Sequence, residues 1–239
     1  MGMDNILVLK LGSSVLTNGT DRISRGKLED IASQISELQS KYRIVLVSSG
    51  AIATARQFIN QEDWKEAVVS KQAMSAIGQP KLMQLYFEIF SDFNLKIAQC
   101  LVTYRDFVNE IPRENVYNTV LELVSHNYVP IINENDTVAV DEIVLGDNDK
   151  LSAKVATLLG AKQLVLASDI DGLYNKNPHL HKDAQLITDI SDFSTIRQYI
   201  DEKSTGPGTG GMTSKLEAAE ICSREKIDTF IVNGRREKF

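Results

Sequence analysis

The chain has 239 residues, with 26 basic and 32 acidic side chains, a formal net charge of −6 and no basic block. This balance argues against a nucleic-acid surface and favours small soluble ligands. Cys100 and Cys222 are isolated and lack zinc or CxxC spacing, which fits reduced thiols. Because no apolar run reaches membrane-spanning length and no signal pattern opens the chain, we expect a cytoplasmic protein without a membrane partner. The length favours one large α/β domain, covering residues 1–239, over two small ones.

In chain order, continuous apolar runs predict buried strands at residues 5–11, 43–49, 96–103, 128–133, 163–168 and 228–233. Helical spacing lies between them, beginning with a helix that Ser24 can cap and whose apolar face comprises Leu28, Ile31, Ile35 and Leu38. Residues 114–127, 150–161 and 215–226 have similar patterns. The alternation predicts an α/β fold, an open and mostly parallel sheet with helices on both faces.

Three further segments are less regular. Residues 81–90, directly after Pro80, are apolar enough for core, and a helical dimer contact is the alternative. Residues 175–183 are typical of a surface loop, and residues 203–211 of a mobile one.

Polar clusters follow four of the predicted strands. They are KLGSS (10–14), SSGA (48–51), NENDT (133–137) and SDIDG (168–172). Ordinary turn chemistry explains any one of them. Because open parallel sheets bind ligands beyond the carboxyl ends of their strands, four together predict a binding site.

Two lysines near glycines suggest a polyphosphate ligand. Lys10 ends an apolar strand just before Gly12; it could simply extend its ammonium group to solvent, or it could clasp phosphate oxygens. The stretch GTGGMTSKLEAAEIC (208–222) is not a Walker loop, because Met212 follows the last glycine and the lysine comes only at Lys215. Lys215 nevertheless lies just inside a helix preceded by glycines, where anions bind well.

Four acidic residues, Glu134, Asp136, Asp147 and Asp149, lie within a short span. Helix capping explains Asp149 alone, and the spacing does not fit an EF-hand. The cluster suits an acceptor that carries an ammonium group. Together with the lysines it indicates phosphoryl transfer from ATP with Mg²⁺, and an ionised carboxylate as acceptor would need no protein base.

The motifs VLKLGSSVL, VSSGAIA, SKQAMSAIGQ, PIINENDTVA, GDNDKLSA, SDIDGLY and GTGGMTSKLEAA resemble the amino acid kinase superfamily and, within it, the glutamate 5-kinases. They run in the expected order from about residue 6 to residue 233. The resemblance implies a three-layer αβα sandwich that phosphorylates the side-chain carboxylate of L-glutamate to L-glutamyl 5-phosphate, the first step of proline biosynthesis. It further implies a homo-oligomer, a dimer or tetramer, and proline as a feedback inhibitor.

The same resemblance assigns individual roles. Lys10 and Lys215 contact the phosphates and Asp149 aligns them; the glutamate site comprises Ser49, Asp136, Asp147 and Asn148. The nucleotide site comprises Lys10, Gly12, Ser168, Asp169, Thr209, Gly210, Gly211, Met212, Thr213, Ser214 and Lys215. Three departures stand out: the chain has no room for the PUA domain of longer members, it ends soon after the last predicted strand, and Ser168 stands where threonine is common.

Other hypotheses remain open at this stage. A different kinase of the superfamily, acting on a carbamate, an acetylated amino acid, a nucleotide or an isoprenoid phosphate, shares several motifs; the acidic acceptor side argues against a second phosphate. A non-catalytic sensor on the same fold is a second alternative. A dinucleotide-dependent dehydrogenase is disfavoured because no GxGxxG follows the first strand. His179, His181 and Asp183 form a weak metal motif without a fourth ligand.

Overall fold

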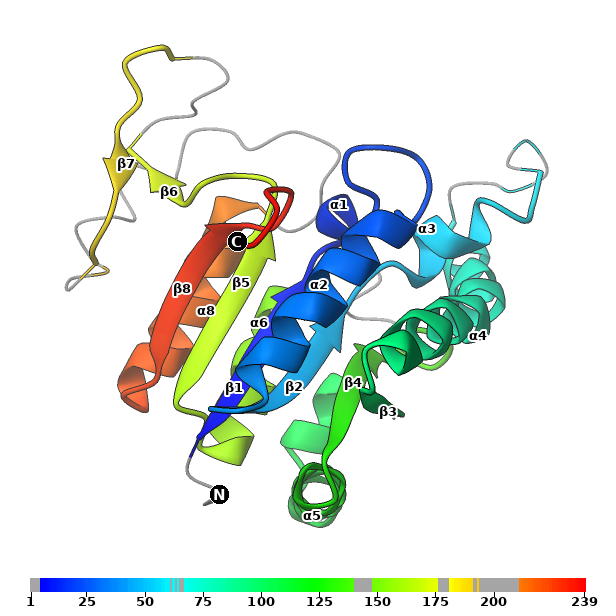
Figure 1. Ribbon diagram of the computed structural model, residues 1–239, viewed down its shortest axis with the longest axis horizontal. Helices are drawn as coiled ribbons and strands as arrows, with labels where there is room; N and C mark the ends of the chain where they lie inside the picture. The colour runs from blue at the N-terminus through cyan, green and yellow to red at the C-terminus, as the bar shows by residue number, and fades with distance from the viewer. Residues whose placement is uncertain are drawn as a thin grey trace.

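The computed structural model describes residues 5–60, 62, 64, 67–139, 148–175, 181–190, 193 and 211–239. Within these residues a parallel sheet of six strands runs in the order β3-β4-β2-β1-β5-β8. The strands are β1 (Ile6–Leu11), β2 (Arg43–Ser48), β3 (Lys96–Val102), β4 (Tyr128–Glu134), β5 (Gln163–Ser168) and β8 (Asp228–Asn233). Each matches a predicted apolar run to within a residue, so the strand predictions are confirmed (Figure 1).

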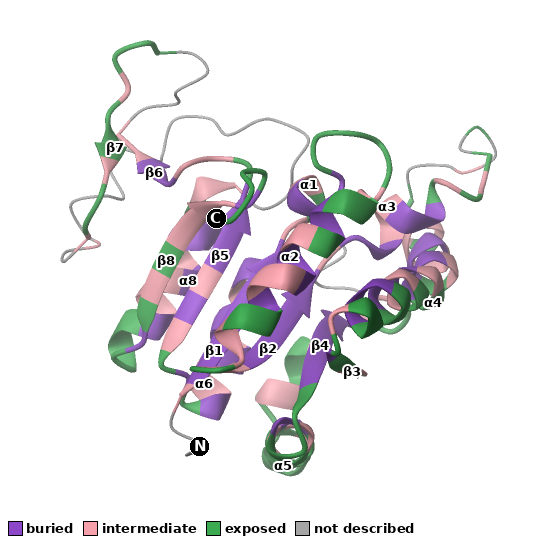
Figure 2. Ribbon diagram, in the orientation of Figure 1, coloured by how far each residue is buried: buried purple, intermediate pink, exposed green. Residues whose placement is uncertain are grey.

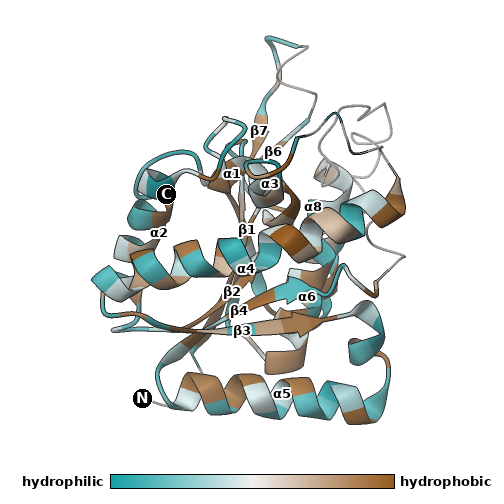
Figure 3. Ribbon diagram, turned by 90° about the vertical axis from the view of Figure 1, so that its right-hand side faces the viewer, coloured by the Kyte–Doolittle hydropathy of each residue, from teal (hydrophilic) through white to brown (hydrophobic). Residues whose placement is uncertain are grey.

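Helices cover both faces of this sheet. One apolar cluster joins alternate sheet residues to α5 (Glu110–Ser125), α6 (Asn148–Leu159) and α8 (Met212–Arg224). A second joins the intervening sheet residues to α1 (Ser13–Leu16), α2 (Arg25–Leu38) and α4 (Val68–Asp92). Seen from the β3 edge, α4 and α5 lie on opposite sides of the sheet (Figure 3). The three-layer αβα sandwich is therefore confirmed.

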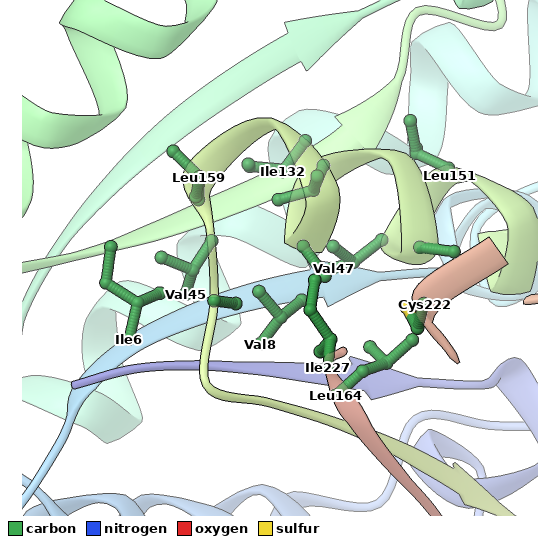
Figure 4. Packing of buried hydrophobic residues seen from close by; sticks show 14 of the residues in the cluster. Ile6, Val8, Val45, Val47, Ile132, Leu151, Leu159, Leu164, Cys222 and Ile227 are labelled. Atoms are coloured by element: carbon green, nitrogen blue, oxygen red, sulfur yellow. The ribbon is translucent and has the colours of Figure 1, made fainter. Parts of the chain in front are cut away.

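The central strands are buried because both faces are covered. Every residue of β1 is buried; Ile6 and Val8 belong to one cluster and Leu7 and Leu9 to the other, as the two-residue period of a strand requires. Figure 4 shows Ile6 and Val8 packed with Val45, Leu159 and their neighbours. The edge strands β3 and β8 stay partly exposed (Figure 2).

Helix α2 forms as its sequence predicts. The Ser24 hydroxyl accepts a hydrogen bond from the backbone N–H of Lys27 at 3.2 Å, which caps the first turn. Leu28, Ile31 and Ile35 are buried against the sheet. The predicted apolar face is therefore the packed face.

Helix α4 is longer than the apolar stretch 81–90 that predicts it, because it starts at Val68 and continues through Pro80. Proline removes one helical hydrogen bond, which frees the carbonyl of Ala76 four residues earlier. Both Pro80 and Ala76 are exposed, so water can satisfy that carbonyl. The later half supplies core residues, with Leu82, Tyr86, Ile89 and Phe90 at most 1% exposed.

Shorter elements complete the described chain: α3 (Ala51–Ala55), the 3-10 helix η2 (Tyr104–Phe107), and the antiparallel pair β6 (Leu173–Tyr174) and β7 (Leu186–Ile187). This β6–β7 pair projects beyond the carboxyl ends of the main sheet (Figure 1). The predicted loop at 175–183 is described only at Asn175 and 181–183, and most of the predicted mobile stretch 203–211 lies outside the described residues. No helix among the residues described here is both long and apolar enough to cross a membrane.

Candidate active site

The strand order brings three of the four polar clusters to adjacent strand ends. β1 lies between β2 and β5, and Lys10 is in register with Val47 on one side and Leu166 on the other. From β1 the chain continues to β2 on one side, and β5 lies on the other side, so these strand ends form a topological switch point, the place where open α/β sheets bind ligands. The fourth cluster follows β4, the next neighbour of β2.

Two lysines meet one aspartate at this switch point. The Nζ of Lys10 lies 2.5 Å from Oδ1 of Asp149, and the Nζ of Lys215 lies 2.9 Å from Oδ2. All three residues are buried, Asp149 completely. We call these residues the lysine–aspartate cluster. Two buried ammonium groups are thus held against one carboxylate.

Asp149 is the ionised member that aligns the lysines. Burial by itself would raise the pKa of its carboxyl, but the charges of Lys10 and Lys215 and their hydrogen bonds outweigh that effect and hold the pKa below its usual value. Asp149 stays a carboxylate at neutral pH as a result. It can therefore accept from both ammonium groups at once.

The amino end of α8 is part of the same arrangement. Gly211 is the N-cap residue, Met212 and Thr213 open the helix, and the Ser214 hydroxyl lies 2.9 Å from both Asp149 Oδ2 and the Gly211 carbonyl. Helix α8 thereby places Lys215 in the cluster and directs the positive end of its own dipole towards it. Thr209 and Gly210, the other predicted nucleotide residues of this stretch, lie outside the described residues.

Gly12 keeps the space in front of Lys10 open. A Cβ on Gly12 would lie 3.5 Å from Lys10 Nζ, 3.6 Å from the Ala167 carbonyl oxygen and 3.8 Å from the Ser14 hydroxyl. Any larger side chain would extend from that point beside the ammonium group. The glycine therefore keeps the space beside the Lys10 ammonium group free of a larger side chain.

Asn148 organises the acceptor side. Its Nδ2 lies 3.1 Å from the Ser48 carbonyl oxygen, 2.9 Å from the Ser49 hydroxyl and 3.1 Å from Oδ1 of Asn133. Asn133 in turn donates from Nδ2 to Gln79 Oε1 at 2.9 Å. Residues at the ends of β2 and β4, at the start of α6 and in the middle of α4 are connected in this way.

Asp136 belongs to the same side, where its Oδ2 accepts a hydrogen bond from the Ser75 hydroxyl at 2.5 Å. Ser75 and Gln79 are one helical turn apart on α4, so both face the strand ends. The predicted substrate residue Asp147 lies outside the described residues.

Three contacting residues, Ser75, Gln79 and Asn133, are absent from the site predicted by sequence. The sequence did contain a signal for them. Ser75 and Gln79 are polar residues four positions apart in the motif SKQAMSAIGQ, and Asn133 is an asparagine at the end of a predicted strand. That signal does not identify a partner. The pairing depends on α4 crossing the ends of β2 and β4, which only the packing reveals.

Ser168 and Asp169 occupy the end of β5 as the sequence predicts. The Ser168 hydroxyl lies 3.3 Å from Asp169 Oδ1, and its backbone carbonyl accepts a hydrogen bond from Gly234 at 2.8 Å. Asp169 is exposed, and its Oδ2 lies 3.5 Å from Nη2 of Arg235. The exit of β8 is thereby joined to the exit of β5.

Among the described residues, the weaker histidine signals are not part of a metal cluster. His179 lies outside the described residues, and His181 is exposed. Across the described ranges, no three His, Cys, Asp or Glu side chains gather as a metal cluster. His126 is the C-cap residue of α5, and its Nδ1 lies 2.9 Å from the Glu122 carbonyl oxygen, a contact with the negative end of the helix.

Fold and site together define an α/β protein with two buried lysines and a buried aspartate clustered at the carboxyl ends of a parallel sheet. The model of the amino acid kinase family matches residues 5–233. The chain therefore belongs to the amino acid kinase family.

The curated relatives agree on one activity by name. The chain is 39% identical over 238 residues to a glutamate 5-kinase of Pasteurella multocida and 40% identical to one of Photorhabdus laumondii. These matches cover 99% of this chain and 65% of each relative. The chain thus spans less than two thirds of the relatives' length.

Solved structures support the fold. An isopentenyl phosphate kinase superposes with a TM-score of 0.64 at 18% identity, covering 98% of this chain and 93% of that one. A UMP kinase from Ureaplasma parvum gives the same TM-score at 14% identity, covering 98% and 92%. At these identities the likeness concerns the architecture.

Proposed function

We propose that this protein transfers the γ-phosphoryl group of ATP to the side-chain carboxylate of L-glutamate and forms L-glutamyl 5-phosphate, the first step of proline biosynthesis. The lysine–aspartate cluster is the observation that carries the proposal. Two buried ammonium groups beside a glycine turn and a helix amino end suit the phosphates of a nucleotide. The name shared by the curated relatives supports glutamate as the acceptor.

The transfer forms a bond between the γ-phosphorus and a carboxylate oxygen and breaks the bond to the bridging oxygen of ADP. Lys10 and Lys215 hold the phosphates and balance the charge that accumulates on the leaving oxygen, and Asp149 keeps both ammonium groups in place. An ionised carboxylate loses no proton when it attacks. The site therefore works by position and charge and needs no general base.

The acceptor side supplies groups of opposite character. In the proposal, Asp136 and Asp147 attract the α-ammonium group of glutamate, while the Ser49 hydroxyl and the Asn148 amide bind its oxygens. Ser75 fixes the Asp136 carboxylate through its 2.5 Å hydrogen bond. Asn133 accepts a hydrogen bond from the Asn148 amide and donates one to Gln79. Asn133 therefore holds the Asn148 amide directly, and Gln79 holds Asn133.

The nucleotide side comprises Gly12, Ser168, Asp169 and the run from Thr209 to Lys215. Mg²⁺ would arrive bound to the phosphate oxygens of ATP and to water, where it adds positive charge to the transferred group. Asp149 is already occupied by two lysines, so this chain's role towards the metal is to present the phosphates.

Four finer expectations of the sequence analysis stay predictions. They are a cytoplasmic location, a dimer or tetramer of this chain, inhibition by proline, and a single amino acid kinase domain over residues 1–239. Each concerns the protein beyond its active site.

A trapping assay tests the proposal. The protein is incubated with ATP, Mg²⁺ and hydroxylamine, which converts acyl phosphates to hydroxamates, and with L-glutamate, L-aspartate, N-acetyl-L-glutamate, UMP or isopentenyl phosphate. Hydroxamate formed with L-glutamate alone is the expected result. Phosphorylation of UMP or isopentenyl phosphate, or no turnover with any acceptor, would contradict the proposal and favour another kinase or a sensor.

A further inference from the structure

We propose that Arg235 is a third cation of the nucleotide site and contacts a phosphate group of the bound nucleotide. This inference rests on the proposed function, since it concerns the nucleotide of that reaction. None of the motifs above includes Arg235, which follows β8 at a place far along the chain from Lys10 and Gly12. Its position comes from the fold alone.

Arg235 bridges the two loops assigned to the nucleotide. Its Nε donates to the Ser14 carbonyl oxygen at 3.3 Å, in the short helix α1 whose N-cap residue is Gly12. Its Nη2 lies 3.5 Å from Oδ2 of Asp169 at the end of β5. The guanidinium group therefore lies between the segments that follow β1 and β5.

A close approach of three segments fixes this position. The Gly234 N–H donates to the Ser168 carbonyl at 2.8 Å, and a Cβ on Gly234 would lie 2.9 Å from side-chain atoms of both Val15 and Ala167. Glycine lets the exit of β8 pack directly against α1 and β5. The next residue, Arg235, is thereby placed beside Ser14, close to Gly12 in the chain. The chain after β8 turns back near the end of β5 (Figure 1).

The guanidinium group also has room and donors for a ligand. Its side chain is 40% exposed, and Gly19 lies against the guanidinium group, with a Cβ position 3.6 Å from Cζ. The two polar contacts are long, at 3.3 and 3.5 Å, and an exposed pair of this kind contributes little stability. Arginine has five donors in a planar fork that matches phosphate oxygens, so a phosphate can take over these contacts.

A purely structural role makes a different prediction. If Arg235 only tied the β1 turn to β5, its loss would loosen the whole nucleotide pocket, and adenosine and ADP would bind less tightly to the same extent. A phosphate contact weakens only ligands that carry phosphates. The number of phosphates on the ligand therefore separates the two roles.

Isothermal titration calorimetry with adenosine, AMP and ADP tests the inference on the wild type and on Arg235→Ala, Arg235→Lys and Arg236→Ala. Arg236 is the matched control, because it is the adjacent arginine and its guanidinium pairs with Asp171 at 2.7 Å. We expect Arg235→Ala to raise the Kd of ADP about tenfold and to leave that of adenosine unchanged. The Kd of ADP for Arg235→Lys should lie between those of the wild type and Arg235→Ala, because lysine keeps the positive charge and loses the planar set of donors. The Kd of ADP for Arg236→Ala should match that of the wild type.

An ADP Kd within twofold of the wild type in Arg235→Ala overturns the inference, as does an equal loss for adenosine and ADP. A wild-type chain that binds no ADP overturns it too. Thermal unfolding of each variant confirms that it is folded. If Arg235→Ala does not fold, the comparison of ADP with adenosine is made on Arg235→Lys instead. Glutamate takes no part in these titrations, so the inference can hold even where the hydroxamate assay contradicts glutamate as the acceptor.

Discussion

Lys10 and Lys215 come from opposite ends of the chain and contact the two oxygens of one carboxylate, at 2.5 and 2.9 Å. A central strand supplies the first lysine and the helix before the last strand supplies the second. Asp149, at the start of α6, joins them. The distance between the two ammonium groups is thus set by a buried side chain and not by a loop.

Replacing either lysine should remove transition-state stabilisation. We expect Lys215→Ala and Lys10→Ala to lower kcat roughly a hundredfold, because one well-aimed cationic contact contributes on the order of 3 kcal/mol. Hydroxamate formation from L-glutamate measures the change. Lys162→Ala, an exposed lysine at the opposite end of the sheet, is the control and should keep full activity. Full activity in Lys215→Ala would remove the role proposed for that residue.

Asp149→Asn should destabilise the fold in a pH-dependent way. The substitution leaves two buried ammonium groups without their counter-charge, which costs roughly 3–5 kcal/mol of unfolding free energy at neutral pH. The folded-state pKa of Asp149 is lowered, so its contribution is fully present above the unfolded pKa of about 4 and is lost as pH falls through the lowered folded value. Urea unfolding from pH 3 to 8 should show a gap between wild type and variant that narrows below about pH 4. A gap of constant size would contradict this account.

On the acceptor side, Asp136→Asn should raise the KM for glutamate with little effect on the KM for ATP. The neutral amide loses the attraction for the substrate's ammonium group, and a tenfold rise is the expected size, equivalent to about 1.4 kcal/mol. Ser75→Ala should show a smaller rise, because it removes only the hydrogen bond that positions Asp136. Steady-state kinetics with each substrate varied in turn provides both constants.

Asp92→Asn provides the matched charge control, since Asp92 is exposed at the far end of α4. Its KM for glutamate should equal that of the wild type. If Asp136→Asn behaves like this control, Asp136 does not bind the substrate.

The strands and the α2 helix were predictable because a single physical rule decides them. A parallel strand covered on both faces is apolar along nearly its whole length, as β1 is apart from Lys10 near its carboxyl end, and a helix on a sheet shows one apolar face, as α2 does. The place of the site was predictable as well, because ligands gather where parallel strands end.

The partners within the site were not predictable in this way. Whether Ser75 reaches Asp136, or Arg235 reaches Asp169, depends on how α4 and the exit of β8 pack against the sheet. Local periodicity carries no such information. Pro80 also concealed the first half of α4, because proline ordinarily ends a helix and is tolerated here on the solvent face.

The two cysteines should differ in reactivity. Burial raises the pKa of Cys222 to about 11, with a hydrogen bond to Thr229 opposing the rise in part. At pH 8 roughly one thiol in a thousand would then be ionised, and the thiolate is the form that reacts. Mass spectrometry after iodoacetamide treatment should show Cys222 unmodified in the folded protein, with slow labelling of the half-buried Cys100. In urea both should react at similar rates; rapid labelling of native Cys222 would contradict its burial.

Gly78 should be indispensable for the packing of α4 on α3, and hence for the acceptor side. A Cβ at Gly78 would lie 1.8 Å from the Ala51 carbonyl oxygen and 2.8 Å from the backbone N of Ala55, and backbone atoms cannot rotate away as a side chain would. We expect Gly78→Ala to lower the unfolding free energy by about 3 kcal/mol or more and to raise the KM for glutamate, because α4 carries Ser75 and Gln79.

Gly26→Ala is the matched control: Gly26 lies in α2 with no atom within 4 Å of its Cβ position. That substitution should be neutral or stabilise by up to about 1 kcal/mol through helix propensity, so a similar loss in both variants would show that the contact with α3 is not the cause.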